Sequence, residues 1–183
     1  METSLDAPSG AVAPASREAK TPAVAVLAQQ EPKQYLTFLL GGEMFAIGIL
    51  AIKEIIEYRN ITEVPMMPEC VRGVINLRGA VVPVMDLQAR FGRQSSEVSK
   101  RTCIVIVEVN TEDGRQVVGL IVDAVSEVLD ISGADIEPPP AFGAHIRADF
   151  IQGMGKVKDR FVILLDIDRV FSQDELASLA QVA

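Results

Sequence analysis

The chain lacks tryptophan, has a single histidine, and devotes only 5% of its 183 residues to aromatic side chains. So few aromatic rings leave little surface on which nucleic-acid bases can stack. The formal net charge is −8, and no run of basic residues offsets it. Because nucleic-acid binding depends on clustered lysine and arginine side chains, we expect no nucleic-acid partner.

Side chains that carry catalysis or hold metals are also scarce. A lone histidine such as His145 is more often a surface or hydrogen-bonded residue than a general base. Cys70 and Cys103 form no CxxC pair, and we interpret both as reduced, semi-buried core residues. No glycine-rich phosphate loop precedes a helix. The sequence therefore favours a protein that binds partners over an enzyme, with no metal and no cofactor.

Long hydrophobic runs are absent as well. No apolar run approaches the roughly 20 residues that span a bilayer. The most apolar N-terminal stretch, residues 23–28, is too short for the core of a signal peptide and follows no basic cluster. We therefore expect a cytoplasmic protein with no direct membrane insertion.

Composition separates a tail from an ordered region. Residues 1–33 are rich in alanine, proline and serine and show no hydrophobic period, which predicts a disordered N-terminal tail. Ordered structure is expected from Gln34 onward. Residues 35–40 and 44–47 predict two strands that form a hairpin around a Gly-Gly-Glu turn.

Three later segments complete the expected elements. Residues 49–56 fit either a helical face or an isoleucine-rich strand, and we favour a strand with a bend. Residues 101–109 and 116–122 predict a second hairpin. A capping-box pattern predicts a C-terminal helix over residues 172–183.

One segment of the chain occurs twice. Residues 71–91 match residues 151–171 without gaps, and a similar apolar stretch precedes each copy. The identical pairs are Gly73/Gly153, Val82/Val162, Asp86/Asp166 and Phe91/Phe171. This order predicts two similar units, near residues 34–93 and 101–171. Two small β-barrels with short helices at the corners are the simplest architecture for them.

Several positions within the repeat point to structural roles. Asp86 and Asp166 each precede a short predicted helix, where a carboxylate caps free N–H groups. Their equivalence favours this role over a catalytic carboxylate pair. Pro83 cannot donate a hydrogen bond to a sheet, which predicts that its strand is an edge strand or is bulged there.

The two copies differ at the turn between their predicted strands. The first has Asn76-Leu77-Arg78-Gly79, and the second has Lys156-Val157-Lys158-Asp159. Arg78 is either a partner-binding guanidinium at a hairpin tip or a solvated turn residue that contributes little. The pattern alone favours neither. Glu54 lies in an otherwise apolar stretch and is a candidate ion-pair partner for Arg78.

Residues 71–79 and 82–87 together resemble the signature of the CheW family of chemotaxis coupling proteins. The similarity extends from about Gln34 to the C-terminal helix and includes residues 35–40, 47–56, 118–128 and 136–138. It implies a mainly β fold of two SH3-like five-stranded β-barrel subdomains within a CheW-like domain over residues 34–175.

The resemblance also implies a function and a set of partners. Family members are non-catalytic adaptors that join the histidine kinase CheA, through its CheW-like regulatory domain, to the cytoplasmic tips of methyl-accepting chemoreceptors. The chain is then expected in the cytoplasm, recruited to membrane-associated receptor arrays. The alternative is a scaffold of the same kind in an array that governs pili, biofilm or development. A related module inside a larger chain, with receiver or kinase domains, is not expected.

Protein-binding residues follow from the same resemblance, position by position. Arg78 and Glu54 match the arginine and glutamate that are associated with receptor and kinase coupling, and Asn76 belongs to the same hairpin. Ile52, Ile55 and Gly73 match neighbouring positions of the receptor-binding surface. Val122, Asp123 and Val125 match positions in the second barrel's share of a groove for a receptor helix.

Overall fold

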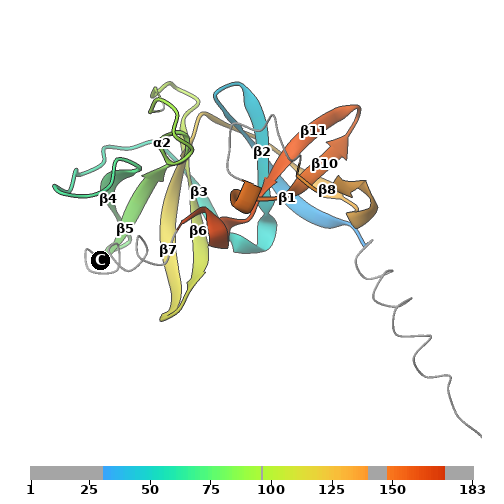
Figure 1. The fold of residues 1–183 in the computed structure, drawn as a ribbon. Helices are drawn as coiled ribbons and strands as arrows, with labels where there is room; N and C mark the ends of the chain where they lie inside the picture. The colour runs from blue at the N-terminus through green and yellow to red at the C-terminus, as the bar shows by residue number, and fades with distance from the viewer. Residues whose placement is uncertain (1–30, 96, 140–147, 172–183) are drawn as a thin grey trace, which may run out of the picture.

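The computed structural model describes residues 31–95, 97–139 and 148–171. Within them the fold is mainly β, with two curled sheets side by side (Figure 1). We call the sheet at the right of Figure 1 the first barrel and the sheet at its left the second barrel. The mainly β, two-subdomain, SH3-like fold that the sequence predicts is confirmed.

The first barrel contains six strands, in the order β8-β1-β2-β11-β10-β9. Their bounds are β1 Lys33–Leu40, β2 Glu43–Gly48, β8 Ala124–Ile131, β9 Ile136–Glu137, β10 Ile151–Val157 and β11 Arg160–Leu165. The short β9 is the strand beyond the expected five. A Cβ added at Gly155 on β10 would lie 3.2 Å from Ile131 on β8, although these strands are not hydrogen-bonded neighbours. The sheet therefore curls back on itself.

The second barrel contains five strands, in the order β3-β6-β7-β5-β4. Their bounds are β3 Ile52–Glu57, β4 Val71–Leu77, β5 Ala80–Asp86, β6 Cys103–Thr111 and β7 Gly114–Val122. Short helical turns connect the strands: η1 Ile49–Ala51, α2 Leu87–Arg90, η2 Gly133–Asp135, η3 Ala148–Phe150 and α3 Ile167–Val170.

The two sequence repeats exchange strands. Each barrel takes a hairpin from one unit, β1–β2 or β6–β7, and the remaining strands from the other. The parallel contacts of β2 with β11 and of β7 with β5 join the two contributions. The boundaries near residues 34–93 and 101–171 therefore describe the duplication but not the barrels. This exchange was not readable from the sequence.

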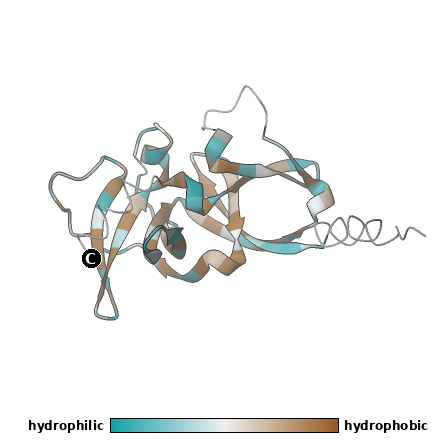
Figure 2. Ribbon diagram, turned by 60° about the horizontal axis from the view of Figure 1, so that its bottom comes forward, coloured by the Kyte–Doolittle hydropathy of each residue, from teal (hydrophilic) through white to brown (hydrophobic). Residues whose placement is uncertain are grey.

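Period-2 alternation along the strands builds three apolar cores. On β7, Val118 and Leu120 face a core between the barrels, whereas Ile121 faces the interior of the second barrel. Tyr35 and Ile131 belong to the interior of the first barrel. Burial on both faces requires apolar residues at consecutive positions, and brown bands along the strands mark them in Figure 2.

Most local predictions are confirmed, with small shifts. Both hairpins form, although the first strand begins at Lys33, within the predicted tail. Residues 49–56 are not one bent strand, because η1 precedes β3. Cys70 is buried and Cys103 is partly buried, and both are free cysteines. The rest of the tail, His145 and the C-terminal helix lie outside the described residues.

Pro83 does not lie on an edge strand, so that part of the prediction is wrong. Its strand β5 is held between β7 and β4. Val74 lies opposite Pro83, but its backbone N–H and C=O groups both form hydrogen bonds with Thr62. The carbonyl of Val74 therefore does not need the backbone N–H that proline lacks. The pairing of β5 with β7 starts only at Val84. Strand β5 thus accommodates proline at the position just before its pairing with β7 begins. The bulge lies on β4, near Arg72, and not at Pro83.

The caps of the short helices are confirmed. Asp86 accepts hydrogen bonds from the backbone N–H groups of Gln88 and Ala89, and Asp166 accepts one from Asp168. These contacts end strands β5 and β11 with the same strand-to-helix corner. Among the described residues, no helix is long and apolar enough to cross a membrane.

Candidate functional site

Arg78 lies in the two-residue turn between β4 and β5. Arg78 has a φ of 53° and Gly79 one of 85°, the pair of positive φ values that a tight hairpin turn with right-handed strand twist requires. The side-chain oxygen of Asn76 accepts a hydrogen bond from Gly79 N at 2.9 Å. Asn76 therefore helps to shape the turn that presents Arg78.

Arg78 and Glu54 form an ion pair. Arg78 Nη1 lies 2.8 Å from Glu54 Oε2, and the two side chains are 78% and 23% exposed. They come from opposite edges of the sheet, β4 and β3, which the curl of the barrel brings together. An ion pair this exposed contributes little to stability. Its main effect is to hold the guanidinium in place while most of it faces solvent.

A groove of about 370 Å³ borders this ion pair. Its apolar wall includes Leu77 and Val81, and Val81 is 43% exposed. Lys53 and Arg115 add positive charge beside Arg78. An apolar floor with a cationic rim fits a partner that offers apolar side chains and carboxylates.

The first barrel carries an equivalent groove, of about 330 Å³. Lys158 takes the place of Arg78 in a turn of the same shape, with φ 48° followed by 64° at Asp159. Glu127 takes the place of Glu54, and Phe161, which is 51% exposed, that of Val81. Sequence reasoning missed this groove, although the 80-residue offset of the repeat carries Val81 directly onto Phe161.

Gly73 is a packing position. It is buried with a φ of 147°, and a Cβ there would lie 2.1 Å from the carbonyl oxygen of Thr62. Thr62 and Val74 exchange backbone hydrogen bonds of 2.9 and 2.8 Å beside it. The structure therefore places Gly73 beneath a loop and gives it no side chain to offer a partner.

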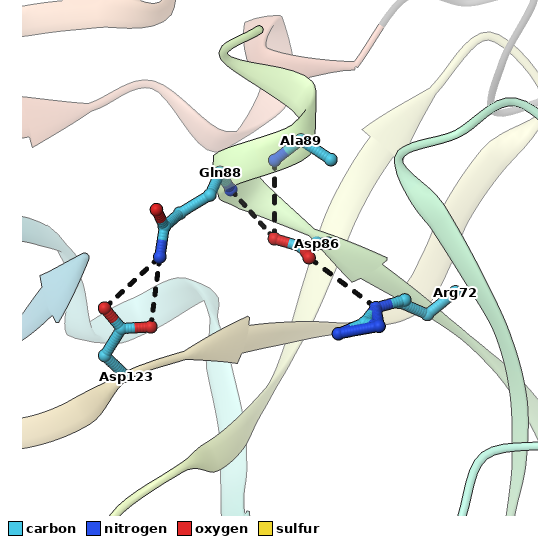
Figure 3. A network of polar contacts seen from close by, with 5 residues as sticks. All are labelled: Arg72, Asp86, Gln88, Ala89 and Asp123. Atoms are coloured by element: carbon cyan, nitrogen blue, oxygen red, sulfur yellow. Dashed lines mark hydrogen bonds and ion pairs between the residues drawn. The ribbon is translucent and has the colours of Figure 1, made fainter. Parts of the chain in front are cut away.

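Asp123 lies at the joint between the barrels. Its carboxylate accepts a hydrogen bond from Gly41 N at 2.8 Å. It also accepts one from Gln88 Nε2 at 3.1 Å, which Figure 3 shows. Gly41 belongs to the β1–β2 turn of the first barrel, and Gln88 follows β5 of the second. In the same network, Arg72 Nε lies 3.6 Å from the fully buried carboxylate of Asp86.

The expected site residues therefore separate into two groups. Arg78, Glu54 and Asn76 meet at one end of the second barrel. Val122 and Asp123 lie at the other end, because β7 runs parallel to β5 with Ile121 opposite Asp86. At about 3.3 Å per residue the separation is on the order of 25 Å. One small ligand cannot contact both groups.

The remaining expected residues border the core between the barrels or the surface of β3. Val122 is fully buried, and Ile52 and Val125 are partly buried against the same core. Ile55 is 43% exposed, and its counterpart on β8, Val128, is 48% exposed. No group of three or more histidine, cysteine or acidic residues in the described ranges is arranged to hold a metal ion.

Comparisons with known proteins agree with this geometry. The family model described as "CheW-like domain" matches residues 34–175. The chain is 34% identical over 151 residues to "Chemotaxis protein CheW" of Klebsiella aerogenes, covering 82% of the chain and 89% of the relative. It is 36% identical over 143 residues to the protein of that name from Rhizobium meliloti, covering 78% and 90%.

A solved structure gives the same result. The scaffolding protein TtCheW from Thermoanaerobacter tengcongensis matches with a TM-score of 0.70 and 38% sequence identity. The match covers 79% of the chain and 90% of that structure.

Proposed function

The chain belongs to the family of CheW-like domain proteins, and we propose that it is a non-catalytic adaptor that couples the histidine kinase CheA to methyl-accepting chemoreceptors. Scaffold proteins of this family serve chemotaxis signalling. The adaptor is cytoplasmic and is recruited to membrane-associated receptor arrays. CheA binds through its CheW-like regulatory domain, and the receptors bind through their cytoplasmic tips.

The observation that carries the proposal is the exposed ion pair between Arg78 and Glu54. A guanidinium that is held in place before binding loses less side-chain entropy when a partner arrives. The neighbouring groove offers Val81 and Leu77 for apolar contact. A protein interface of ordinary size buries roughly 800 Å² on each partner, several times the surface of the ion pair. Arg78 therefore acts as the charged anchor of a larger contact.

A second contact serves the receptor. A receptor tip is a helical hairpin, and a groove between two barrels accepts the apolar face of such a helix. Ile52 and Val125 are partly buried against the core between the barrels and supply apolar surface there. Ile52 lies two residues from Glu54 on β3, whereas Val125 follows Asp123, which lies on the order of 25 Å from Arg78. A contact at Val125 and a contact at Arg78 can therefore be made at the same time, as a coupling protein requires.

The test is co-sedimentation of the purified chain with receptor-containing membranes and CheA. Arg78→Glu should weaken coupling, by about 2–5 kcal/mol if the charge is desolvated in the complex, and should leave the fold intact. Arg101→Glu, at an exposed loop position, makes the same change of charge elsewhere and should co-sediment normally. Unchanged co-sedimentation of Arg78→Glu would contradict the proposal.

An affinity pull-down from native lysate identifies the array that the chain serves. Recovery of flagellar chemoreceptors supports the main proposal. Recovery of receptors from a system for pili, biofilm or development supports the alternative scaffold role with the same contacts. An assay for kinase or nucleotide-hydrolysis activity on the purified chain should give none.

A further inference from the structure

Leu50 and Met66 are large apolar residues in the described ranges whose side chains are almost fully exposed, and Leu50 lines a mainly apolar pocket. Leu50 lies in η1, and its side chain is 99% exposed, as if it were detached from the fold. A single, partly exposed leucine is common on protein surfaces. A leucine that is almost fully exposed beside an apolar pocket is unusual. The pocket beside it has a volume of about 490 Å³ and includes Tyr35, Ile49 and Ile167 in its lining.

The repeat explains why Leu50 is free of a structural role. When Glu54 is aligned with Glu127, Leu50 corresponds to Asp123, the residue that accepts a hydrogen bond from Gly41 N in the β1–β2 turn. In the other half, Asp168, which the repeat aligns with Gln88, has a carboxylate that accepts from Asn110 N on β6 at 2.8 Å. The position of Leu50 therefore lacks the polar contact that Asp123 makes, and it carries an apolar side chain.

We propose that residues 21–30 of the same chain cover Leu50 by placing the apolar stretch 23–28 in this pocket. This occupant goes beyond the adaptor function and does not depend on it. Residues 21–30 contain no charged side chain, and residues 23–28 read Ala-Val-Ala-Val-Leu-Ala. Such a stretch suits a predominantly apolar lining, and burying it together with Leu50 removes apolar surface of both from water.

The position of the chain supports this occupant. Lys33 and Gln34, the first residues of β1, themselves line the pocket, and only Glu31 and Pro32 separate them from residues 21–30. The backbone bends at Glu31, just before Pro32. The five residue steps from Ala28 to Lys33 span at most about 18 Å when extended, which is enough to reach across a pocket of this size. Covalent attachment keeps the local concentration of the segment high.

The opposite end of the chain is a poorer occupant. Residues 172–183 contain Asp174 and Glu175, and transferring their carboxylates from water into a mainly apolar pocket is costly. A second pocket on the other side of Leu50 is lined by Glu108, Asn110, Arg115 and Asp168 and is too polar for an apolar segment. The uncharged segment and the apolar pocket therefore match each other.

Hydrogen exchange on the full-length chain tests the inference. Amides of residues 23–28 should exchange about tenfold more slowly than those of an unstructured peptide of the same sequence. Leu50→Asp should abolish that protection. Val98→Asp, at another apolar surface position that is 50% exposed, is the matched control and should retain it. Leu27→Asp, in the segment itself, should abolish protection in the same way.

A photo-reactive benzoyl-phenylalanine in place of Leu50 identifies the occupant directly. The inference expects cross-links to residues 21–30 within one chain, at a yield that does not change on dilution. Cross-links to residues 172–183, cross-links between two chains, or unprotected amides at residues 23–28 would each overturn it. Unchanged exchange in β6 and β7 of each variant shows that the fold is intact, so loss of protection reports on the contact alone.

Discussion

Arg78 Nη1 lies 2.8 Å from Glu54 Oε2, although the two residues belong to strands at opposite edges of one sheet. The contact exists because the sheet curls until its edges meet. It holds a side chain that remains 78% exposed. A residue so arranged has its position set by the fold and its charge available to a partner.

The role of Glu54 is to orient Arg78, and this can be measured. Glu54→Gln removes the charge that holds the guanidinium and should weaken binding to CheA or receptor about two- to fivefold, the effect of an exposed ion pair. The double charge swap Glu54→Arg with Arg78→Glu should fold normally and bind poorly, because the partner then meets the wrong sign. Recovery of binding by the double swap would show that the pair acts only within the fold.

Gly73 should be the least replaceable glycine of the repeat. Gly73→Ala places a Cβ 2.1 Å from a backbone oxygen at a φ of 147°, and should destabilise the fold by more than about 2 kcal/mol. In Gly153→Ala the nearest atom is a side-chain carbon of Ile136 at 2.6 Å, with no unfavourable φ. That variant should lose less stability in urea denaturation. Equal losses would contradict the assigned cause.

The two helix caps should differ in energy despite their equivalence. Asp86 is fully buried, accepts from two backbone N–H groups and faces Arg72. Asp166 is 34% exposed in its side chain and accepts from one. Asp86→Ala should cost about 3 kcal/mol, because it removes the buried acceptor of two backbone N–H groups and the carboxylate beside Arg72. Asp166→Ala should cost about 1 kcal/mol, and urea denaturation of both variants compares them.

Asp123 should matter to the joint more than to either barrel. Asp123→Ala removes the acceptor for Gly41 N and for Gln88 Nε2, at a cost of about 1–3 kcal/mol. Hydrogen exchange should increase at the β1–β2 turn and around α2, while the centres of β6 and β7 stay protected. Gln88→Ala removes only one partner and serves as the milder comparison. A uniform increase in exchange across both barrels would assign Asp123 to global stability instead.

Tyr35 predicts the behaviour at alkaline pH. Burial raises the pKa of the Tyr35 hydroxyl above its ordinary value of 10.0, because the phenolate is poorly solvated there. The folded state then holds this proton more tightly than the unfolded state. Its contribution is complete below pH 10 and is lost as pH rises through the folded-state pKa. Tyr35→Phe should flatten the decline in stability above pH 10 in urea titrations, with Tyr58→Phe as the control.

Local structure followed from the sequence because its causes lie within a few residues. A glycine-containing turn between alternating apolar residues specifies a hairpin, and an acidic residue before a short helix specifies a cap. Both hairpins and both caps are found at those places. The prediction of an edge strand at Pro83 was wrong because a distant residue makes proline acceptable there. Thr62 forms the backbone hydrogen bonds of Val74, the residue opposite Pro83.

Only part of the candidate site could be predicted from the sequence. Arg78 stood out because the second copy of the repeat lacks it. The placement of Asp123 at the joint, some 25 Å from Arg78 by the rise of about 3.3 Å per residue, depends on which strands run parallel. The groove with Phe161 was not predicted, because it is lined by residues of β1, β2, β8, β10 and β11 that only the assembled barrel brings together.

The sequence by itself determined two similar β units, their turns and caps, and the resemblance to a family of adaptors. Only the tertiary structure decided that each barrel draws strands from both units. An alternating strand buries its apolar face equally well against either copy of a repeated partner, so the local pattern is the same for both pairings. The choice is made by long-range packing, and that packing brings Glu54 to Arg78.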